Sequence, residues 1–202
     1  LDLDEPSDAD RLRALASGAD VFCQGYRSGA LERRGFGAEE LAASRPGLVH
    51  VTINCYGDVG PWRERPGWEQ LAQSVTGVAA VQGGGAERPV LIPAAACDYT
   101  TGYLAALGTM AALWRRSTEG GSYQVRVSLA ATGRWFTDLG AVCDPAAATG
   151  LGDTDAWRTE SVRADGSTLR HLAPVAQLSA TPARWDRPSP PLGADRPEWL
   201  PR

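Results

Sequence analysis

Apolar positions along the first 140 residues follow two periods in turn, one typical of helices and one typical of strands. Short apolar runs rich in β-branched residues predict strands, and apolar spacings of three and four residues predict the helices between them. The predicted helices span 6–19, 38–45, 68–80 and 99–114, and the predicted strands span 20–24, 48–53 and 123–129. Such alternation favours an α/β fold with a Rossmann-like, mostly parallel sheet flanked by helices.

The pattern weakens beyond about Cys143, where Ala, Gly and Asp residues dominate. The last stretch is then rich in proline, which breaks both helices and central strands. We therefore predict a large-domain core over residues 1–142. Residues 143–202 are predicted to form a shortened connection and an extended Pro-rich C-terminal tail that packs on the core.

Composition narrows the possible functions. The chain has 202 residues, 43% of them hydrophobic and 22% charged, as in an ordinary globular protein. A net charge of -4 gives no general attraction to nucleic acid or to an anionic membrane. The four cysteines form no CxxC pair, so neither a metal site nor a redox motif is indicated. No signal peptide or membrane-spanning apolar run is evident, and we expect a cytoplasmic protein.

Asp98 is the strongest candidate for chemistry. It stands where a loop bounded by Pro93 enters the longest predicted helix. Unpaired backbone N–H groups at a helix start can hold a carboxylate ionised and oriented, as a nucleophilic carboxylate requires. The alternative is that Asp98 only caps the helix, because Asp is a favoured N-cap residue. Cys97 has no His in its local sequence, so we expect a small buried filler there.

Two glycine-containing loops follow predicted strands. The first, 24–37, combines glycines with Arg27, Arg33 and a third arginine, which suits a phosphate-bearing ligand, although a solvated basic turn is the alternative. It is neither a Walker loop nor a Gly-x-Gly-x-x-Gly motif. The second, 56–62, could with Trp68 flank an acyl chain or a purine, although these aromatics could also belong to the core. Only two histidines are present and no Gly-x-Ser-x-Gly elbow, so serine hydrolase chemistry is disfavoured.

Several short motifs across roughly residues 1–140, together with a segment at 189–193, occur in a specific order and spacing. They are Leu1-Asp2-Leu3, Asp20-Val21-Phe22, Tyr26 to Leu31, Gly35-Phe36-Gly37, Arg45 to Val49, Tyr56-Gly57 with Gly60-Pro61, Gln73 to Gly77, Asp98 with Thr101-Gly102, and Ser189 to Gly193. This set resembles the class III CoA-transferases of the CaiB/BaiF type, the family of formyl-CoA transferase, carnitine CoA-transferase and α-methylacyl-CoA racemase.

The resemblance implies an activity and a site. Asp98 falls on the family's catalytic aspartate, which would attack an acyl-CoA thioester and transfer coenzyme A to a carboxylic acid. Arg33 falls on a CoA-contacting arginine, and further CoA contacts are implied for Gly25, Tyr26, Arg27, Gly57, Gly67 and Trp68. The implied substrates are an acyl-CoA and a carboxylic acid, with coenzyme A as the cofactor and no metal. A homodimer or a homologous half-chain is the implied partner.

Departures from the family pattern leave two alternatives open. The family's opening strand and glycine turn would precede Leu1, its small domain is shortened here, and Asp4 and Gly25 replace a Lys and an Asn. The chain could therefore be a non-catalytic or partner-dependent half that binds CoA. A racemase is less well supported, because Trp68 stands where that branch has a His and an indole cannot shuttle a proton.

Overall fold

The computed structural model describes residues 1–85, 87–140 and 154–200. The chain divides into two compact units, one formed by Leu1–Ala141 with Trp199–Arg202 and the other by Val142–Glu198. Cys143 and the predicted connection that begins there lie outside the described residues up to position 153.

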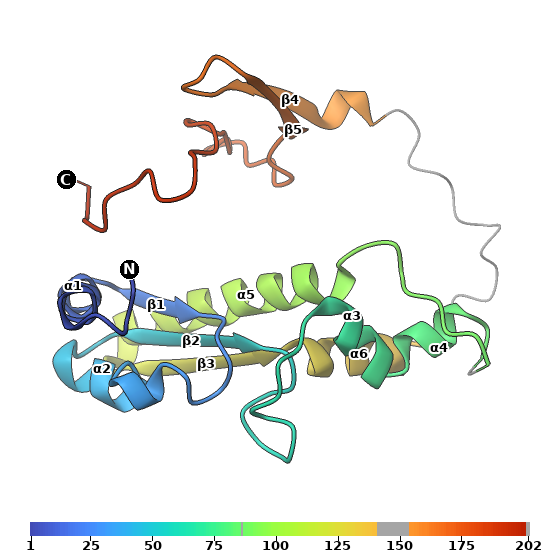
Figure 1. Ribbon diagram of the computed structural model, residues 1–202, viewed down its shortest axis with the longest axis horizontal. Coiled ribbons are helices and arrows are strands. Elements are labelled where there is room, and N and C mark those ends of the chain that lie inside the picture. The colour runs from blue at the N-terminus through green and yellow to red at the C-terminus, as the bar shows by residue number, and fades with distance from the viewer. Residues whose placement is uncertain (86, 141–153, 201–202) are drawn as a thin grey trace. The chain divides into compact units, whose positions relative to one another are not determined.

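The first unit is built on a three-stranded parallel sheet (Figure 1). Its strands are β1 (Val21–Gln24), β2 (Val49–Asn54) and β3 (Tyr123–Ser128), in the order β1-β2-β3. Helices flank this sheet, so the predicted α/β fold class is confirmed. Because all three strands are parallel, their carboxyl ends open on one edge of the sheet, where ligands usually bind in such folds.

The strand register separates an apolar face from a polar face. Val51 is aligned with Cys23 on one side and Val125 on the other, whereas Thr52 is aligned with Gln24 and Arg126. Since side chains alternate along a strand, the first row points to one face and the second row to the other.

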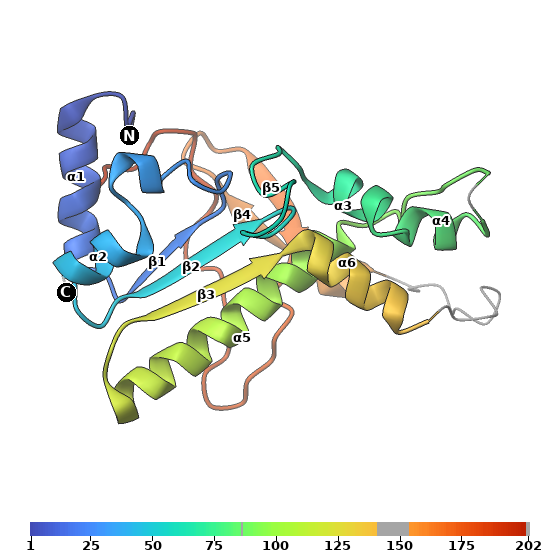
Figure 2. The ribbon, with the colours of Figure 1, turned by 90° about the horizontal axis from the view of Figure 1, so that it is seen from below.

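Helix α5 (Ala96–Glu119) covers the apolar face and runs along β2 and β3 (Figure 2). Ala105 and Ala112 of this helix are buried against Val49 and Val51. Small residues at the contact allow the helix to lie close to the sheet. A Cβ atom at Gly108 would come within 2.8 Å of a Val125 methyl group, so the packing there depends on glycine.

The polar face is covered at its β1 end by a second apolar cluster. This cluster joins α1 (Pro6–Ser17), the 3-10 helix η1 (Glu32–Arg34) and α2 (Ala38–Ser44) to the start of β2. Its buried members are Ala9, Ala16, Ala19, Leu31, Phe36, Leu41 and Leu48.

Several predicted element boundaries were wrong. Helix α5 begins three residues before and ends five residues after the helix predicted over 99–114. The helix predicted over 68–80 is two helices, α3 (Glu69–Val75) and α4 (Val78–Gln82), because Gly77 between them has a φ of 85° that ends the first helix. Leu129, predicted as the end of a strand, begins α6 (Leu129–Asp138). The Ser128 side chain caps that helix by accepting a hydrogen bond from the Ala131 amide at 3.2 Å.

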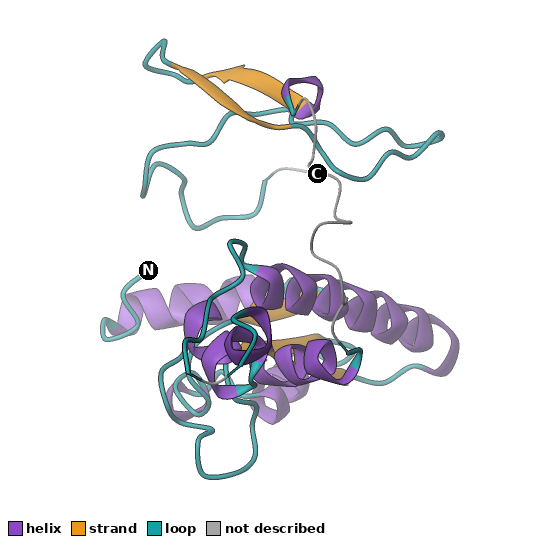
Figure 3. Cartoon of the chain, turned by 90° about the vertical axis from the view of Figure 1, so that its right-hand side faces the viewer, coloured by secondary structure: helices purple, strands orange, loops and turns teal. Residues whose placement is uncertain are grey.

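The second unit contains an antiparallel pair of strands within the region predicted as a tail (Figure 3). A 3-10 helix, η3 (Asp155–Trp157), precedes β4 (Arg158–Val162), which pairs with β5 (Thr168–Leu172). The sequence pattern did not predict this hairpin. The following stretch, 173–198, contains neither helix nor strand, in agreement with a Pro-rich extended segment.

None of the helices in the described ranges is both long enough and apolar enough to span a membrane.

Two glycines of α5 provide a matched test of how closely this helix packs. At Gly102 a Cβ atom would meet nothing within 4 Å, so we expect Gly102→Ala to raise the free energy of unfolding by about 0.5–1 kcal/mol through helix propensity. Gly108→Ala gains the same propensity but must displace Val125, and overpacking of this kind costs about 1–3 kcal/mol. Urea unfolding of both variants measures the difference. Equal stabilisation by the two substitutions would contradict the close packing of α5 on β3.

Candidate active site

A cavity of about 220 Å³ lies beyond the carboxyl ends of the strands. Its wall is formed by the loop after β1, the end of β2, the segment before α3 and the first turns of α5 and α6. The lining residues are Gly25, Tyr26, Arg27, Ile53, Asn54, Cys55, Arg63, Arg65, Gly67, Trp68, Asp98 and Leu129. The parallel sheet thus brings together segments that are up to about a hundred residues apart in the sequence.

Most of the predicted site residues meet in this cavity. Asp98 lines it together with Gly25, Tyr26, Arg27, Gly67 and Trp68. Gly57 instead lines a neighbouring, more apolar cavity of about 510 Å³ beside β3 and α6. Arg33 lies in η1 and lines neither of these two cavities.

Gly67 allows the chain to pass close to the end of β2. A Cβ atom at this position would overlap the side chain of Cys55 and come within 2.8 Å of the Tyr56 ring. The close approach also lets the Cys55 thiol donate a hydrogen bond to the Trp68 carbonyl oxygen at 3.8 Å. The indole of Trp68 is 56% exposed, so it presents a flat apolar surface at the cavity and is not part of the core.

A polar network fixes the loop after β2. Asn54 donates from Nδ2 to Asp58 Oδ1 at 3.0 Å and accepts a hydrogen bond from the Gly57 amide through Oδ1. Asp58 is also 3.6 Å from Arg126 Nε and accepts from the Ser28 hydroxyl at 3.4 Å. These bonds tie the loops that follow β1 and β2 to β3, so both loops around the cavity are held by the sheet.

Glu69 caps the helix that carries Asp98. Its carboxylate accepts hydrogen bonds from the backbone N–H groups of Cys97 at 3.1 Å and Asp98 at 2.6 Å. Gln73 supports the cap by donating to Glu69 Oε1 at 2.7 Å and to the Ala94 carbonyl at 3.2 Å, and it accepts from the Ile92 amide at 2.8 Å. Both side chains are almost completely buried.

The cap changes the expected role of Asp98. The N-cap residue of α5 is Ala95, and Asp98 lies in the first turn, so the interpretation of Asp98 as the capping residue was wrong. The amide groups expected to hold the Asp98 carboxylate are bonded to Glu69. Burial raises the pKa of Asp98 above its ordinary value, and the nearby Glu69 charge raises it further. Asp98 is therefore a more basic carboxylate than a helix start alone would produce.

The neighbouring thiols are in a setting that keeps them protonated. Cys97 is fully buried, as expected for a filler residue. Burial and the Glu69 charge raise the pKa of the Cys97 thiol to about 12, and burial also raises the pKa of Cys55. A thiol must lose its proton to act as a nucleophile, so the arrangement favours the carboxylate over either thiol.

Three arginines give the cavity a cationic side. The Arg27 guanidinium makes no ion pair with any described residue, whereas Arg63 pairs with Glu64 at 3.2 Å. The Arg65 guanidinium lies over the Trp62 ring, 4.7 Å from its centroid. Sequence reasoning missed Arg63 and Arg65, although two arginines between two tryptophans over 62–68 were a signal. Within the described ranges, no cluster of three His, Cys, Asp or Glu residues could hold a metal ion.

The fold and the cavity together define an α/β protein. Its candidate site lies at the carboxyl edge of a parallel sheet and contains one aspartate and three arginines. The family model for CoA-transferase family III matches residues 1–150. The chain belongs to CoA-transferase family III.

Similar proteins carry transferase names. The chain is 45% identical over 139 residues to an acyl-CoA transferase of Gibberella moniliformis, covering 65% of this chain and 24% of that protein. It is 35% identical over 177 residues to the acetyl-coenzyme A transferase nodX of Hypoxylon pulicicidum, covering 85% of this chain and 28% of that protein. The crystal structure of Rv3272 from Mycobacterium tuberculosis superposes with a TM-score of 0.64 at 26% identity, covering 69% of this chain and 39% of that chain. The chain thus spans about a quarter of the length of these two curated relatives.

Removing the cap should destabilise the first unit. Glu69→Ala leaves two backbone N–H groups and the Gln73 amide without their acceptor, and we expect a loss of about 2–3 kcal/mol in the free energy of unfolding. Glu69→Gln retains one acceptor oxygen and the side-chain shape, so its loss should be smaller. Urea unfolding monitored by circular dichroism compares the two variants. No destabilisation by Glu69→Ala would show that α5 does not depend on this cap.

The raised pKa of Asp98 should make stability depend on pH in a defined direction. Because the folded protein holds this proton more tightly than the unfolded chain, the unfolded state loses it first as pH rises above about 3.9, and the free energy of unfolding falls. Asp98→Asn cannot titrate. The stability of this variant relative to the wild type should therefore increase as pH rises from about 3 to 7. Denaturant unfolding at several pH values measures it, and an unchanging difference would contradict the raised pKa.

Proposed function

We propose that this chain transfers coenzyme A between an acyl-CoA thioester and a carboxylic acid, with Asp98 as the nucleophile. The supporting observation is the position of Asp98, whose raised-pKa carboxylate opens on a cavity that also contains Arg27, Arg63 and Arg65. Family membership supports CoA transfer in general. The mechanism and the residue roles are the proposal.

The cavity has the chemical groups that coenzyme A requires. Arginine guanidinium groups bind phosphate oxygens through paired N–H donors, and Arg27 is not engaged by any described acidic residue. Tyr26 and Trp68 are 64% and 56% exposed and would contact the adenine or the pantetheine arm. The thioester would then lie at Asp98, which lines the same cavity.

The chemistry would proceed by exchange at carbonyl carbons. An Asp98 carboxylate oxygen attacks the thioester carbonyl carbon, the C–S bond breaks, and CoA thiolate leaves, which forms a mixed anhydride between Asp98 and the acyl group. The thiolate attacks the Asp98 carbonyl carbon of the anhydride, which releases the donor acid and forms an aspartyl thioester. The acceptor carboxylate then attacks this thioester, and the released thiolate takes the new acyl group from the second anhydride. Each step retains an activated carboxyl group, and the net reaction needs no redox partner.

Glu69 would support this chemistry through its charge. A carboxylate that is destabilised by partial desolvation and by a neighbouring negative charge gains more when it forms a neutral anhydride or thioester. The cap also fixes the first turn of α5 through the Asp98 amide. Asp98 would thus be held in place although no described residue donates a hydrogen bond to its carboxylate oxygen atoms.

A partner-dependent half is the second candidate, and the subunit naming of one relative favours it. The relatives include a protein named as the beta subunit of a succinyl-CoA–L-malate CoA-transferase. In that case a homologous chain or a second copy would complete the site. The observable difference is CoA binding by this chain alone.

The mechanism predicts covalent labelling of one aspartate. After incubation with acetyl-CoA or succinyl-CoA, hydroxylamine should convert Asp98 to a hydroxamate, because both the anhydride and the thioester react with it. Peptide mass spectrometry locates the label. Asp98→Asn should remain unlabelled at this position while still binding CoA in a calorimetric titration.

Two results distinguish the transferase that uses Asp98 as its nucleophile from the partner-dependent half. CoA binding by the wild type without a label on Asp98 would contradict the nucleophile assignment. Absence of CoA binding by the chain alone, restored by adding a homologous CoA-transferase chain, would instead establish the partner-dependent half.

A further inference from the structure

The antiparallel hairpin of the second unit holds a serine and a histidine within hydrogen-bond distance of each other. Ser161 of β4 lies opposite Leu169, and His171 of β5 lies opposite Thr159. Because side chains alternate along a strand, these four residues share one face of the hairpin, and Ser161 and His171 are diagonal neighbours on it. The Ser161 hydroxyl oxygen is 2.7 Å from His171 Nε2.

A main-chain carbonyl group fixes the orientation of the His171 ring. His171 Nδ1 is 3.0 Å from the Leu172 carbonyl oxygen, which can only accept a hydrogen bond, so Nδ1 carries the proton of the neutral ring. Nε2 is then the acceptor, and the Ser161 hydroxyl donates to it. The hydroxyl proton of Ser161 is therefore directed at a nitrogen atom that can take it up.

Trp185 packs beside this pair. Its indole donates from Nε1 to the same Leu172 carbonyl oxygen at 3.1 Å, and its ring lies edge-on to the His171 ring with 6.4 Å between the centroids. Ser161 and His171 are both half-buried. The pair is thus held by its neighbours and still accessible to a small molecule.

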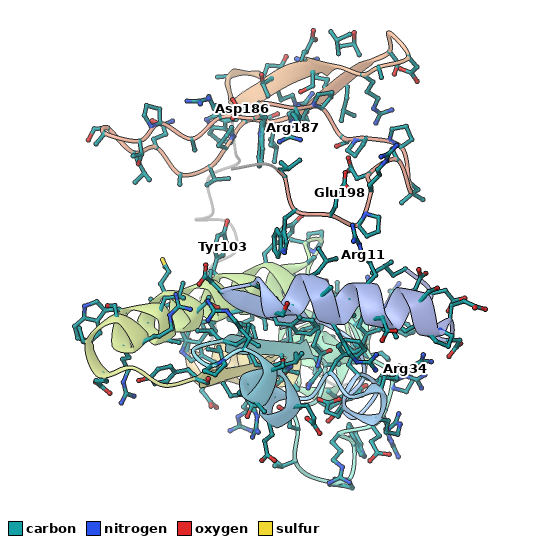
Figure 4. All side chains as sticks on the ribbon, turned by 90° about the vertical axis from the view of Figure 1, so that its left-hand side faces the viewer. Arg11, Arg34, Tyr103, Asp186, Arg187 and Glu198 are labelled. Atoms are coloured by element: carbon teal, nitrogen blue, oxygen red, sulfur yellow. The ribbon has the colours of Figure 1, made fainter. Side chains whose placement is uncertain are left out.

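The charged side chains of the two strands lie on the other face of the hairpin. These residues are Arg158, Glu160 and Arg170, and all three are exposed. The two arginines pair with Asp155 at 3.4 and 3.1 Å. In the segment that follows the hairpin, Arg184 pairs with Asp186 at 2.6 Å (Figure 4). The contacts of the imidazole are thus a hydroxyl, a carbonyl and an indole.

A second serine of the same hairpin provides a matched comparison. Ser167, between the two strands, donates its hydroxyl hydrogen to Asp165 Oδ1 at 2.6 Å. The hydrogen bonds from Ser167 hold the pKa of Asp165 below its ordinary value, so this carboxylate is a weak proton acceptor. The two serines therefore differ in the base to which they are bonded.

We propose that Ser161 is a second acyl-accepting nucleophile of this chain, with His171 as its general base and activated carboxylic esters as the donors. A nucleophile that is hydrogen-bonded to a base, which a third group orients, is the arrangement that activates a hydroxyl. The sequence pattern did not indicate the pair, because it did not predict the hairpin. The inference rests on the second unit and not on the proposed transfer of coenzyme A.

The step balances without a further reactant. Ser161 Oγ attacks the ester carbonyl carbon while His171 Nε2 takes up the hydroxyl proton. The bond between the carbonyl carbon and the ester oxygen then breaks, and the departing oxygen receives the proton from the imidazolium. The products are an acyl-serine and an alcohol or phenol.

Acetylation of the full chain by p-nitrophenyl acetate tests the assignment. The chain contains no lysine, so acetyl groups do not accumulate on side-chain amines. Peptide mass spectrometry should show that Ser161 is acetylated at least about a hundredfold faster than Ser167, because general base catalysis contributes about 10²–10⁴-fold. His171→Gln can form hydrogen bonds but cannot take up the proton, and it should lower the Ser161 rate to that of Ser167. Equal rates at the two serines in the wild type, or an undiminished Ser161 rate in His171→Gln, would overturn the proposal.

The pH dependence of the wild-type reaction gives a readout that needs no variant. The Ser161 rate should rise between about pH 5 and 8, the range in which a histidine loses its charge, and then level off. Acetylation without a general base would continue to increase with hydroxide concentration, and that profile at Ser161 would overturn the role of His171. Because the probe contains no coenzyme A and the readout is on Ser161, none of these results bears on labelling of Asp98 by an acyl-CoA.

Discussion

The contact between the Glu69 carboxylate and the first turn of α5 is the interaction on which the site depends. Burying a carboxylate is costly unless strong hydrogen bonds compensate, and here two backbone amides and the Gln73 side chain provide them. Through this one group, α3 sets where α5 begins and the segment from Ile92 to Ala94 is tied down. Desolvation raises the pKa of Asp98, and the Glu69 charge adds to that rise. The position of Asp98 and part of its basicity therefore have a common origin.

Other contacts in the first unit hold α5 and the neighbouring loops in place around the cavity. The buried alanines of α5 hold the helix against β2 and β3, and the Asn54–Asp58–Arg126 network holds the loop after β2. Gly67 allows the next segment to approach Cys55, so Trp68 and the arginines before it reach the same edge. The shape of the cavity thus depends on a few positions where two segments of the main chain lie close together. A larger side chain at such a position would displace a whole segment.

The sequence predicts the parts of this structure that depend on local pattern. The β-branched run of β2 and the alternation in β3 locate two strands, and the long apolar period of α5 places Asp98 at a helix start. The break at Gly77 was missed because apolar spacing continues across it, and α6 was missed because Leu129 also extends the alternation of β3. The capping group could not be predicted. Asp98 is itself a good capping residue, and only tertiary folding brings Glu69, 29 positions earlier, to the helix end.

Because Glu69 and not Asp98 caps α5, the cap affects both the stability of the helix and the reactivity of Asp98. If Asp98 accepted the helix amides itself, its pKa would fall and its oxygen atoms would be engaged, which stabilises the helix but weakens a nucleophile. With Glu69 as the cap, the helix keeps its hydrogen bonds, and the cost appears as repulsion between two nearby negative charges. That cost is relieved when Asp98 becomes neutral. Protonation relieves it, and acylation of the proposed nucleophile would relieve it in the same way, because both make Asp98 neutral.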